Sequence, residues 1–192
     1  MSVRVRRSRE DVVRTAGRLF AERGYHGTSM RDLGDALGLL GSSLYAHVDG
    51  KEGLLAEVIA RGAALFQALA DEVAAWEDRP TEQLRRLVAG HVRIVTENLD
   101  EARVFLHETR FLSPAHRRRV VELRDRYEAA YRDALAKGVA AGVFRPGLDV
   151  PFATTVVLSI LNSLERWYRP AGPKTPEDLA RDLFYFVLEA IT

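Results

Sequence analysis

The sequence contains no cysteine, which excludes a disulfide framework, a thiolate nucleophile and a thiolate metal site. It also lacks the apolar core of a signal peptide at its N-terminus, and it shows no run of about 18 apolar residues of the kind that crosses a bilayer. Among its 192 residues, 47% are hydrophobic and 29% are charged, which is an ordinary composition for a soluble chain with a sizeable core. We therefore expect a cytoplasmic protein.

The motifs of common enzyme classes are missing as well. The sequence has no Gly-rich phosphate loop, no Gly-x-Ser-x-Gly and no His-Glu-x-x-His pattern. No two of its five histidines stand at the helical spacing of metal ligands, so His91 and His107 are interpreted as packed or hydrogen-bonded core groups. We expect no catalysis, no cofactor and no required metal.

The net charge is only +1, but its distribution along the chain is uneven. The first 51 residues hold nine Arg or Lys against six Asp or Glu, and the remainder has a balance of −2. Arg4, Arg6 and Arg7 precede the first predicted helix. These three arginines would form a basic N-terminal arm that is suited to lie along phosphates or in a minor groove of DNA. The alternative is a solvated basic tail.

Apolar residues recur at intervals of three and four along most of the chain, which predicts an all-α fold of about nine helices. Helix-starting and helix-ending residues place them at about residues 8–23, 30–37, 39–48, 51–76, 84–95, 100–111, 114–141, 151–167 and 176–191. In this division, residues 1–48 form an N-terminal three-helix domain and residues 49–192 form a larger helical domain.

The second and third predicted helices have the arrangement of a DNA-reading helix-turn-helix. Ser29, or alternatively Thr28, is a candidate N-cap residue, and Ser29 with Asp32 fits a capping box. Gly38 ends the helix, and a tight turn leads to a second apolar spacing. That spacing consists of Leu39, Leu44 and Val48.

The other face of the third predicted helix carries small or hydrogen-bonding side chains, which suit contacts with groove edges and phosphates. These are Ser42, Ser43, Tyr45 and His47. An ordinary helical hairpin with a solvated face is the alternative that the pattern alone leaves open.

The segment LFAERGYHGTSMRDLGDALGLLGSSLYAHVDGKEGLL resembles the DNA-binding segment of TetR-type transcriptional regulators over about Val12 to Leu55. A Gly-aromatic pair ends its first helix, a Thr-Ser pair starts the second, and a Leu-Tyr recognition helix precedes Lys51. The resemblance implies that Lys51 contacts a DNA phosphate. The predicted DNA-binding residues are Arg4, Arg6, Arg7, Thr28, Ser29, Ser42, Ser43, Tyr45, His47 and Lys51.

The two C-terminal helices are unusually apolar and carry small residues, which suggests a partner helix pair across a two-fold axis. A four-helix interface of this kind is also what the TetR resemblance implies, and a monomer core is the alternative. Two recognition helices about one DNA turn apart would then read a palindromic operator. The predicted interface residues are Phe152, Val156, Ile160, Leu164, Leu183 and Val187.

The middle helices are where a cavity for a small molecule is expected. Its predicted lining residues are Phe66, His91, Val95, Arg103, Phe105, His107, Arg110, Phe111, Tyr127 and Asn162. Residues 102–150 and 161–170 resemble the acyl-CoA-responsive branch of TetR-type regulators. This resemblance implies an acyl chain in the cavity and phosphates on arginines such as Arg103, Arg110 or Arg117.

The sequence therefore favours a homodimeric repressor that a hydrophobic small molecule, an acyl-CoA by resemblance, releases from its operator. Two alternatives stay open. One is the repressor of an efflux gene that senses a free hydrophobic compound, and the other is a helical interaction module without DNA binding. Ligand ranges differ widely on one fold, so the fold does not choose among them.

Overall fold

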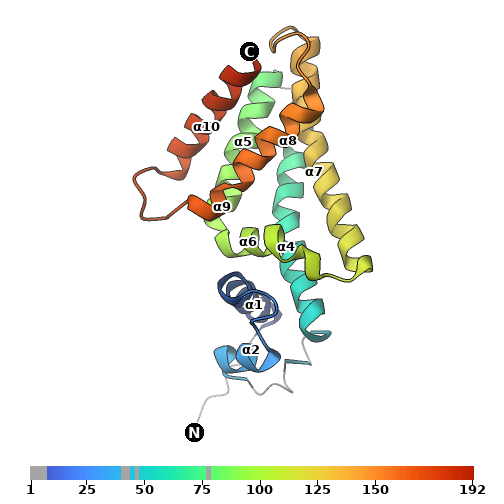
Figure 1. The fold of residues 1–192 in the computed structure, drawn as a ribbon, viewed down its shortest axis with the longest axis vertical. Coiled ribbons are helices and arrows are strands. Elements are labelled where there is room, and N and C mark those ends of the chain that lie inside the picture. The colour runs from blue at the N-terminus through green and yellow to red at the C-terminus, as the bar shows by residue number, and fades with distance from the viewer. Residues whose placement is uncertain (1–7, 40–43, 46–47, 77–78) are drawn as a thin grey trace. The chain divides into compact units, whose positions relative to one another are not determined.

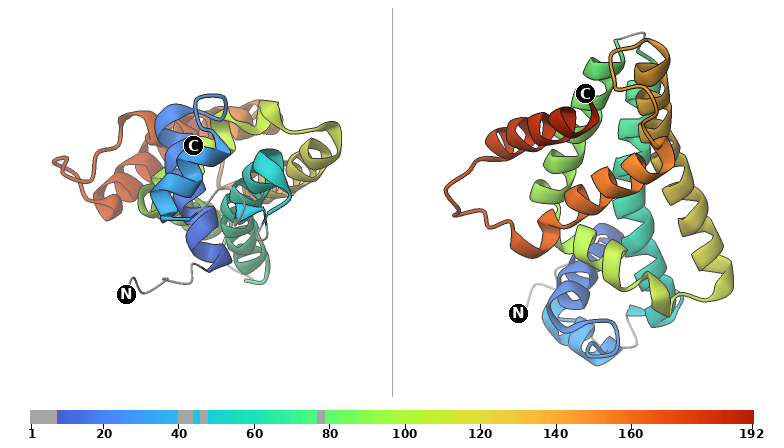
Figure 2. Two further views of the ribbon diagram at one scale, coloured as in Figure 1. Left: turned by 90° about the horizontal axis from the view of Figure 1, so that it is seen from below. Right: turned by 45° about the horizontal axis from the view of Figure 1, so that its top comes forward.

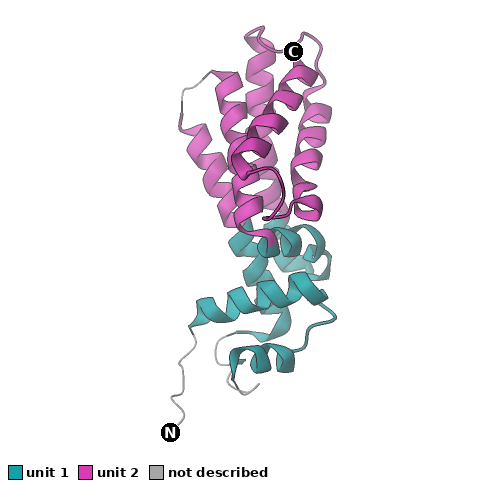
Figure 3. Ribbon diagram, turned by 90° about the vertical axis from the view of Figure 1, so that its left-hand side faces the viewer, with its two compact units in different colours: residues 1–62, 100–120 teal, residues 63–99, 121–192 magenta. Residues whose placement is uncertain are grey.

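The computed structural model describes residues 8–39, 44, 45, 48–76 and 79–192, and the regular structure in these residues is entirely helical. The all-α prediction is confirmed. The chain divides into two compact units (Figure 3): residues 1–62 together with 100–120, and residues 63–99 together with 121–192. This division by packing brings residues 100–120 to the N-terminal segment, and the functional boundary after residue 48 stays a prediction.

The first unit contains α1 (Arg9–Arg23), α2 (Met30–Leu37) and the start of α4 (Gly50–Ala74), shown in blue to cyan in Figure 1. It also contains most of α6 (Leu99–His107), the 3₁₀ turn η1 (Thr109–Phe111) and the start of α7 (Pro114–Ala140). A single helix over residues 100–111 was predicted. That prediction was wrong, because α6 starts at Leu99, ends at His107 and gives way to the 3₁₀ turn.

Helix α1 forms where its capping residues predict it. The Ser8 hydroxyl accepts the Asp11 backbone N–H at 3.1 Å, and the Asp11 carboxylate accepts the Ser8 N–H at 3.0 Å. This reciprocal pairing satisfies donors that a helix start leaves open. One face of α1 is nearly or wholly removed from solvent, through the side chains of Val12, Val13, Ala16, Leu19 and Phe20.

Helix α4 is long and apolar enough, by length and composition alone, to cross a membrane, contrary to the expectation from the sequence. Half of its most apolar window is buried inside the structure. Its buried side chains include Leu54, Leu55, Val58 and Ile59. This is the pattern of a central helix whose apolar stripe packs against other helices.

The second unit is built around α5 (Pro80–Glu97), which packs against α8 (Val150–Asn162), α9 (Leu164–Trp167) and α10 (Pro176–Ile191) (Figures 1 and 2). Its core face is wholly enclosed, with Leu84, Leu87, Val88, Val92 and Val95 at 0% exposure. The helix predicted over 151–167 is in fact two, because the chain breaks at Ser163 between α8 and α9.

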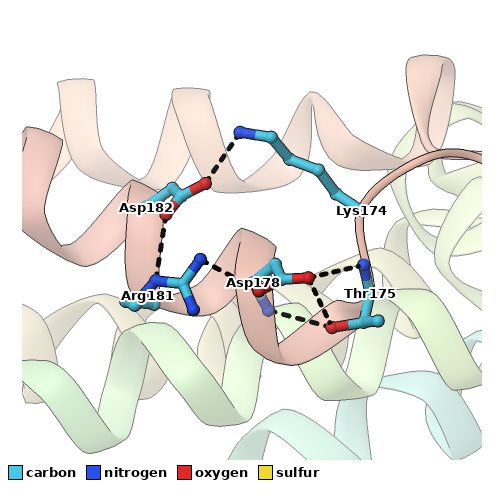
Figure 4. A network of polar contacts seen from close by, with 5 residues as sticks. All are labelled: Lys174, Thr175, Asp178, Arg181 and Asp182. Carbon is cyan, nitrogen blue, oxygen red and sulfur yellow. Dashed lines mark hydrogen bonds and ion pairs between the residues drawn. The ribbon is translucent and has the colours of Figure 1, made fainter.

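A network of polar contacts holds the start of α10 (Figure 4). Thr175 and Asp178 form a capping box, and the hydrogen bond from the Thr175 backbone N–H is the main reason that the Asp178 pKa lies below its usual value. Arg181 pairs with Asp178 at 2.9 Å and with Asp182 at 3.2 Å, and Lys174 pairs with Asp182 at 2.7 Å. The capping residues Thr175 and Asp178, which are close together in the sequence, therefore determine where this last helix begins.

Candidate functional site

The start of α2 is held by the capping box that the sequence predicts. The Ser29 backbone N–H donates to Asp32 Oδ2 at 2.7 Å, and Ser29 Oγ accepts the Asp32 N–H at 3.1 Å. The hydroxyl and backbone hydrogen bonds from Ser29 lower the Asp32 pKa. Gly38 ends the helix with φ +66°, a left-handed conformation that glycine adopts without steric cost.

The structure describes Leu39, Leu44, Tyr45 and Val48 of the predicted recognition segment. Leu44 is wholly buried and Val48 is nearly so, which confirms that both belong to the apolar spacing of this segment. The adjacent Tyr45 is 60% exposed. A large aromatic side chain with a hydroxyl therefore faces outward, next to an anchored neighbour, and is available for a contact with DNA.

Six of the predicted DNA-binding residues lie outside the part of the chain that the structure describes. These residues are Arg4, Arg6, Arg7, Ser42, Ser43 and His47. Their roles stay predictions from the sequence.

Thr28 was predicted to contact DNA, and the structure corrects this prediction. The Thr28 side chain is 0% exposed, and its hydroxyl lies 3.2 Å from the Leu19 carbonyl oxygen and 3.0 Å from that of Gly24. A hydroxyl that donates to the end of α1 inside the core cannot also reach a phosphate. Thr28 instead joins α1 to the start of α2.

Lys51 lies in the first turn of α4, with its ammonium 4.2 Å from the centre of the Tyr25 ring. A cation is disfavoured at a helix N-terminus by the helix dipole. The cation–π contact with Tyr25 offsets this without cancelling the charge. The Lys51 ammonium thus packs against an aromatic ring, an arrangement that is compatible with the predicted phosphate contact.

The segment after α6 packs against the turn between α1 and α2. The Tyr25 backbone N–H donates to Glu108 Oε2 at 2.9 Å. The Phe111 ring stacks on Tyr25 with centroids 5.6 Å apart, and its edge-to-face partner is His26 at 4.4 Å. Phe111 was predicted to line the ligand cavity. We reassign it to this packing of unit 1, because Tyr25 and His26 contact its ring.

Glu52 joins the first turn of α4 to the start of α7. It accepts the Ser113 backbone N–H at 2.8 Å and lies 3.0 Å from His116 Nδ1. These hydrogen bonds, the Ser113 N–H first, lower the Glu52 pKa to about 2. Sequence reasoning missed Glu52, Glu108 and His116, because their partners stand 61, 83 and 64 residues away in the chain.

Three of the predicted ligand-contacting residues come together in the core of the second unit. The Phe66 ring lies 5.0 Å from the His91 ring and 5.1 Å from the Tyr127 ring, centroid to centroid. His91 Nδ1 is 3.0 Å from the Tyr127 hydroxyl. Burial lowers the pKa of His91 to about 3 and raises that of Tyr127. The cluster is therefore an uncharged polar group enclosed by aromatic rings.

The ten predicted ligand residues are divided between the two compact units. Val95 is buried on α5 and Asn162 is half-buried at the end of α8, both in the unit that holds His91. The other five belong to the first unit: Arg103, Phe105, His107, Arg110 and Phe111. The Arg110 guanidinium lies 4.7 Å from the centre of the Phe111 ring.

The predicted dimer residues divide into exposed and buried ones. Phe152 is 67% exposed and Val156 is 38% exposed on α8, whereas Leu164 is wholly buried and Val187 is 2% exposed. Leu164 and Val187 were therefore wrong as interface residues, because their side chains already fill the core of the protomer. Ile160 and Leu183 are half-buried. Helix α10 adds two exposed aromatic residues that were not predicted, Tyr185 at 56% and Phe186 at 60%.

Two family models match the chain. Residues 12–58 match the model described as "Bacterial regulatory proteins, tetR family", and residues 77–191 match "Tetracyclin repressor-like, C-terminal domain". Among curated proteins, the chain is 30% identical over 190 residues to the HTH-type transcriptional repressor KstR2 of Mycobacterium tuberculosis, covering 96% of this chain and 92% of that protein.

Solved structures of the same family superpose on most of the chain. The TetR family transcriptional regulator PfmR from Thermus thermophilus aligns with a TM-score of 0.86 and 38% identity, covering 93% of this chain and 97% of that one. AibR, solved in complex with isovaleryl coenzyme A and operator DNA, aligns with a TM-score of 0.85 and 27% identity, covering 93% and 96%.

These matches confirm the family resemblance and set aside a helical interaction module without DNA binding. The N-terminal match spans α1, α2, Tyr45 and Lys51, so the capped helices and the outward-facing residues described above stand in the DNA-binding segment of the family. The C-terminal match spans α5 to α10 and includes the His91 cluster. The chain belongs to the TetR family of DNA-binding transcriptional regulators, which are not enzymes.

Proposed function

We propose that the chain is a homodimeric repressor that holds a palindromic operator and leaves it when an effector of the acyl-CoA class binds to the larger helical unit. The observation that carries this proposal is the similarity over 93% of the chain to AibR, whose complex contains both isovaleryl coenzyme A and operator DNA. The similarity to KstR2, which is named a repressor, supports the direction of control. A protein acting on DNA in this way is expected in the cytoplasm.

The exposed residues of the first unit support the DNA contact. Tyr45 points outward beside buried Leu44, and Lys51 packs on the Tyr25 ring in the first turn of α4. Ser29, at the start of α2, is exposed although its hydroxyl takes part in the capping box. A helix N-terminus with exposed hydrogen-bonding groups suits a phosphate of the DNA backbone.

The exposed apolar side chains of α8 and α10 support the dimer. Phe152 and Val156 lie on one exposed face of α8, and Tyr185 and Phe186 are adjacent exposed aromatics on α10. The two helices also contact each other within the protomer. Large apolar groups gathered on neighbouring helices indicate an interaction surface, and a second copy of the chain buries them symmetrically.

The enclosed cluster of the second unit supports effector binding. Phe66, His91 and Tyr127 form an apolar and uncharged core site, which suits the hydrophobic part of a small molecule. An effector controls the operator only if it binds the DNA-free arrangement of the dimer better than the DNA-bound one. A repressor that senses a free hydrophobic compound is the second candidate, because the same apolar site would serve it.

We would test the proposal by fluorescence anisotropy, using purified protein and labelled DNA from upstream of its own gene. Isovaleryl-CoA, decanoyl-CoA and the two matching free acids are added in turn. Release by a thioester but not by its acid supports the acyl-CoA class. Equal release by acid and thioester favours the second candidate, and operator binding that resists all four compounds rejects both effector classes.

The DNA contact has its own control in the same assay. Replacing Tyr45 with alanine is expected to weaken operator binding about tenfold, because an exposed side chain that touches DNA is removed while the buried core is untouched. Full affinity in this variant would remove Tyr45 from the proposed interface.

A further inference from the structure

A chain of hydrogen-bonding groups runs through the core of the second unit. The Tyr131 hydroxyl donates to the Leu87 carbonyl oxygen at 2.9 Å. The Tyr127 hydroxyl lies 3.3 Å from that of Tyr131, and His91 Nδ1 lies 3.0 Å from the Tyr127 hydroxyl. Tyr131 is 0%, His91 1% and Tyr127 8% exposed. This series of hydrogen bonds therefore ends at the His91 ring, away from solvent.

The other ring nitrogen of His91 is the unusual atom of this core. Nε2 is buried and has no hydrogen-bond partner within the part of the chain that the structure describes. Buried polar groups are nearly always hydrogen-bonded, so an isolated one calls for a reason. Only burial shifts the pKa of His91, which leaves the ring neutral. One ring nitrogen then carries a hydrogen and the other carries a lone pair.

The available hydrogens in this series of hydrogen bonds determine which ring nitrogen of His91 carries a hydrogen. A carbonyl oxygen can only accept, so the single Tyr131 hydrogen goes to Leu87. The Tyr131 oxygen is then free to accept from Tyr127, and the Tyr127 oxygen in turn accepts from His91 Nδ1–H. All three contacts are satisfied only in this arrangement. It leaves Nε2 as a bare acceptor.

The opposite tautomer is less favourable for two reasons. If Tyr127 donates to His91 Nδ1, the two tyrosine oxygens face each other at 3.3 Å with no hydrogen between them. His91 Nε2 then carries a buried N–H without an acceptor, and orphaned buried donors are rarer than under-satisfied acceptors.

We propose that His91 Nε2 accepts a hydrogen bond from the effector, so that the effector carries a hydroxyl or an amide N–H on the part that enters the core. This inference rests on the proposed effector-binding function of the unit. The Phe66 and Tyr127 rings, 5.0 and 5.9 Å from the His91 ring, provide apolar surroundings for the carbon skeleton around that group. A ketone or ether oxygen at the same point would place one lone pair against another.

A groove of about 600 Å³ between α4, α5 and α10 lies along the same helices. Leu69 and Gly90 both line it; Leu69 follows Phe66 by one helical turn, and Gly90 directly precedes His91. The Leu69 side chain packs directly against Gly90. A Cβ atom added at residue 90 would lie only 2.4 Å from Leu69 Cδ1, so this packing requires glycine. The groove therefore borders the helix segments that carry Phe66 and His91.

The inference is tested first on the wild-type protein without DNA. Isothermal titration calorimetry measures the affinity for decanoyl-CoA bearing a hydroxyl or a ketone, at carbon 3 and at carbon 9. We expect at least one hydroxyl compound to bind about tenfold more tightly than its ketone counterpart, since a hydrogen bond replaces a repelled pair. Equal affinities within both pairs would overturn the inference.

Two variants of His91 then separate the two ring nitrogens. The amide of asparagine reaches the place of Nδ1 and keeps the bond to Tyr127, whereas that of glutamine reaches the place of Nε2. The hydroxyl preference should therefore persist in His91→Gln and disappear in His91→Asn. The reverse result would show that His91 acts only through Tyr127, and the inference would fall.

Histidine-labelled protein provides a readout that does not depend on activity. Two-bond proton–nitrogen NMR correlations should show hydrogen on Nδ1 and none on Nε2, and the Nε2 signal should move when the hydroxyl compound is added. A protonated Nε2 would overturn the inference. Operator binding without ligand is measured on the same preparations, so failure of the proposed repressor function is recognised separately.

Discussion

Glu52, in the first turn of α4, accepts the backbone N–H of Ser113, the residue that precedes α7, at 2.8 Å. The two residues stand 61 positions apart in the sequence. His116, in the first turn of α7, places its Nδ1 atom 3.0 Å from the same Glu52 carboxylate. These contacts connect the start of α4 to the start of α7 within one compact unit. A displacement of one helix start would therefore stretch or break the hydrogen bonds to the other.

This contact predicts an acid-dependent loss of stability. The Glu52 pKa is lowered from 4.5 to about 2, so the contribution of its charge is complete above pH 4.5 and is lost as the pH falls through about 2. Because the Glu52 side chain is 39% exposed, solvent screening limits this contribution to less than about 1 kcal/mol. Chemical unfolding of wild type and Glu52→Gln between pH 7 and pH 2 measures it.

The difference in unfolding free energy between these two proteins should be constant above pH 5 and shrink between about pH 4.5 and pH 2. Glu122→Gln removes one exposed carboxylate from α7 and serves as the matched control. A difference that stays unchanged down to pH 2, or one that Glu122→Gln reproduces, would contradict the assignment.

Thr28→Val should destabilise the protein without altering a DNA contact. The substitution keeps the shape of the side chain and removes a buried hydroxyl that donates to the end of α1, so we expect a loss of about 1 kcal/mol. Thermal or chemical unfolding measures the loss. Operator affinity, corrected for the folded fraction, should equal that of wild type, and a weaker affinity would restore Thr28 as a DNA contact.

Lys51→Ala should flatten the salt dependence of operator binding. Removing one phosphate contact reduces the slope of log affinity against log salt by about 0.9, because fewer counterions are released from the DNA. Anisotropy titrations at several salt concentrations give the slope. Lys137→Ala, which removes an exposed lysine of α7, is the control with the same change in charge. Equal slopes for both variants would remove Lys51 from the interface.

Val156→Arg should convert the proposed dimer to a monomer, because it places a charge on the exposed apolar face of α8. Val121→Arg makes the same replacement at a site of α7 with 45% exposure and should leave the dimer intact. Sedimentation velocity distinguishes the two states. A dimer in both variants would locate the interface elsewhere.

Leu164→Arg belongs to a different class of change. Leu164 has no exposed surface in the protomer, so a charge there is buried without a partner, and we expect unfolding rather than dissociation. Circular dichroism checks this outcome, and a folded monomer would return Leu164 to the interface.

The starts of α1, α2 and α10 could be predicted because their causes lie within four residues. In each of the pairs Ser8–Asp11, Ser29–Asp32 and Thr175–Asp178, both members of the capping box are present in the local sequence. The outward position of Tyr45 beside Leu44 likewise follows from helical spacing. Such features need no knowledge of how distant segments pack.

The roles of several apolar and polar residues depended on packing. A helical stripe shows that Leu164 and Val187 are to be covered, but it does not show whether the cover is the same chain or a second copy. From the sequence, the Thr28 hydroxyl could contact DNA or bond within the protein. It bonds within the protein, because the carbonyl groups of Leu19 and Gly24 near the end of α1 lie within its reach.

The helical class, the starts of α1, α2 and α10 and the family-like DNA-binding segment could be read from the amino-acid sequence alone, because these features depend on residues that are neighbours along the chain. The contacts of Glu52 with Ser113 and of His91 with Tyr127, which join residues 61 and 36 positions apart, became visible only in the folded structure. Hydrogen bonds over such separations are set by which helices pack together. That choice is made by the whole buried surface, and no short motif records it.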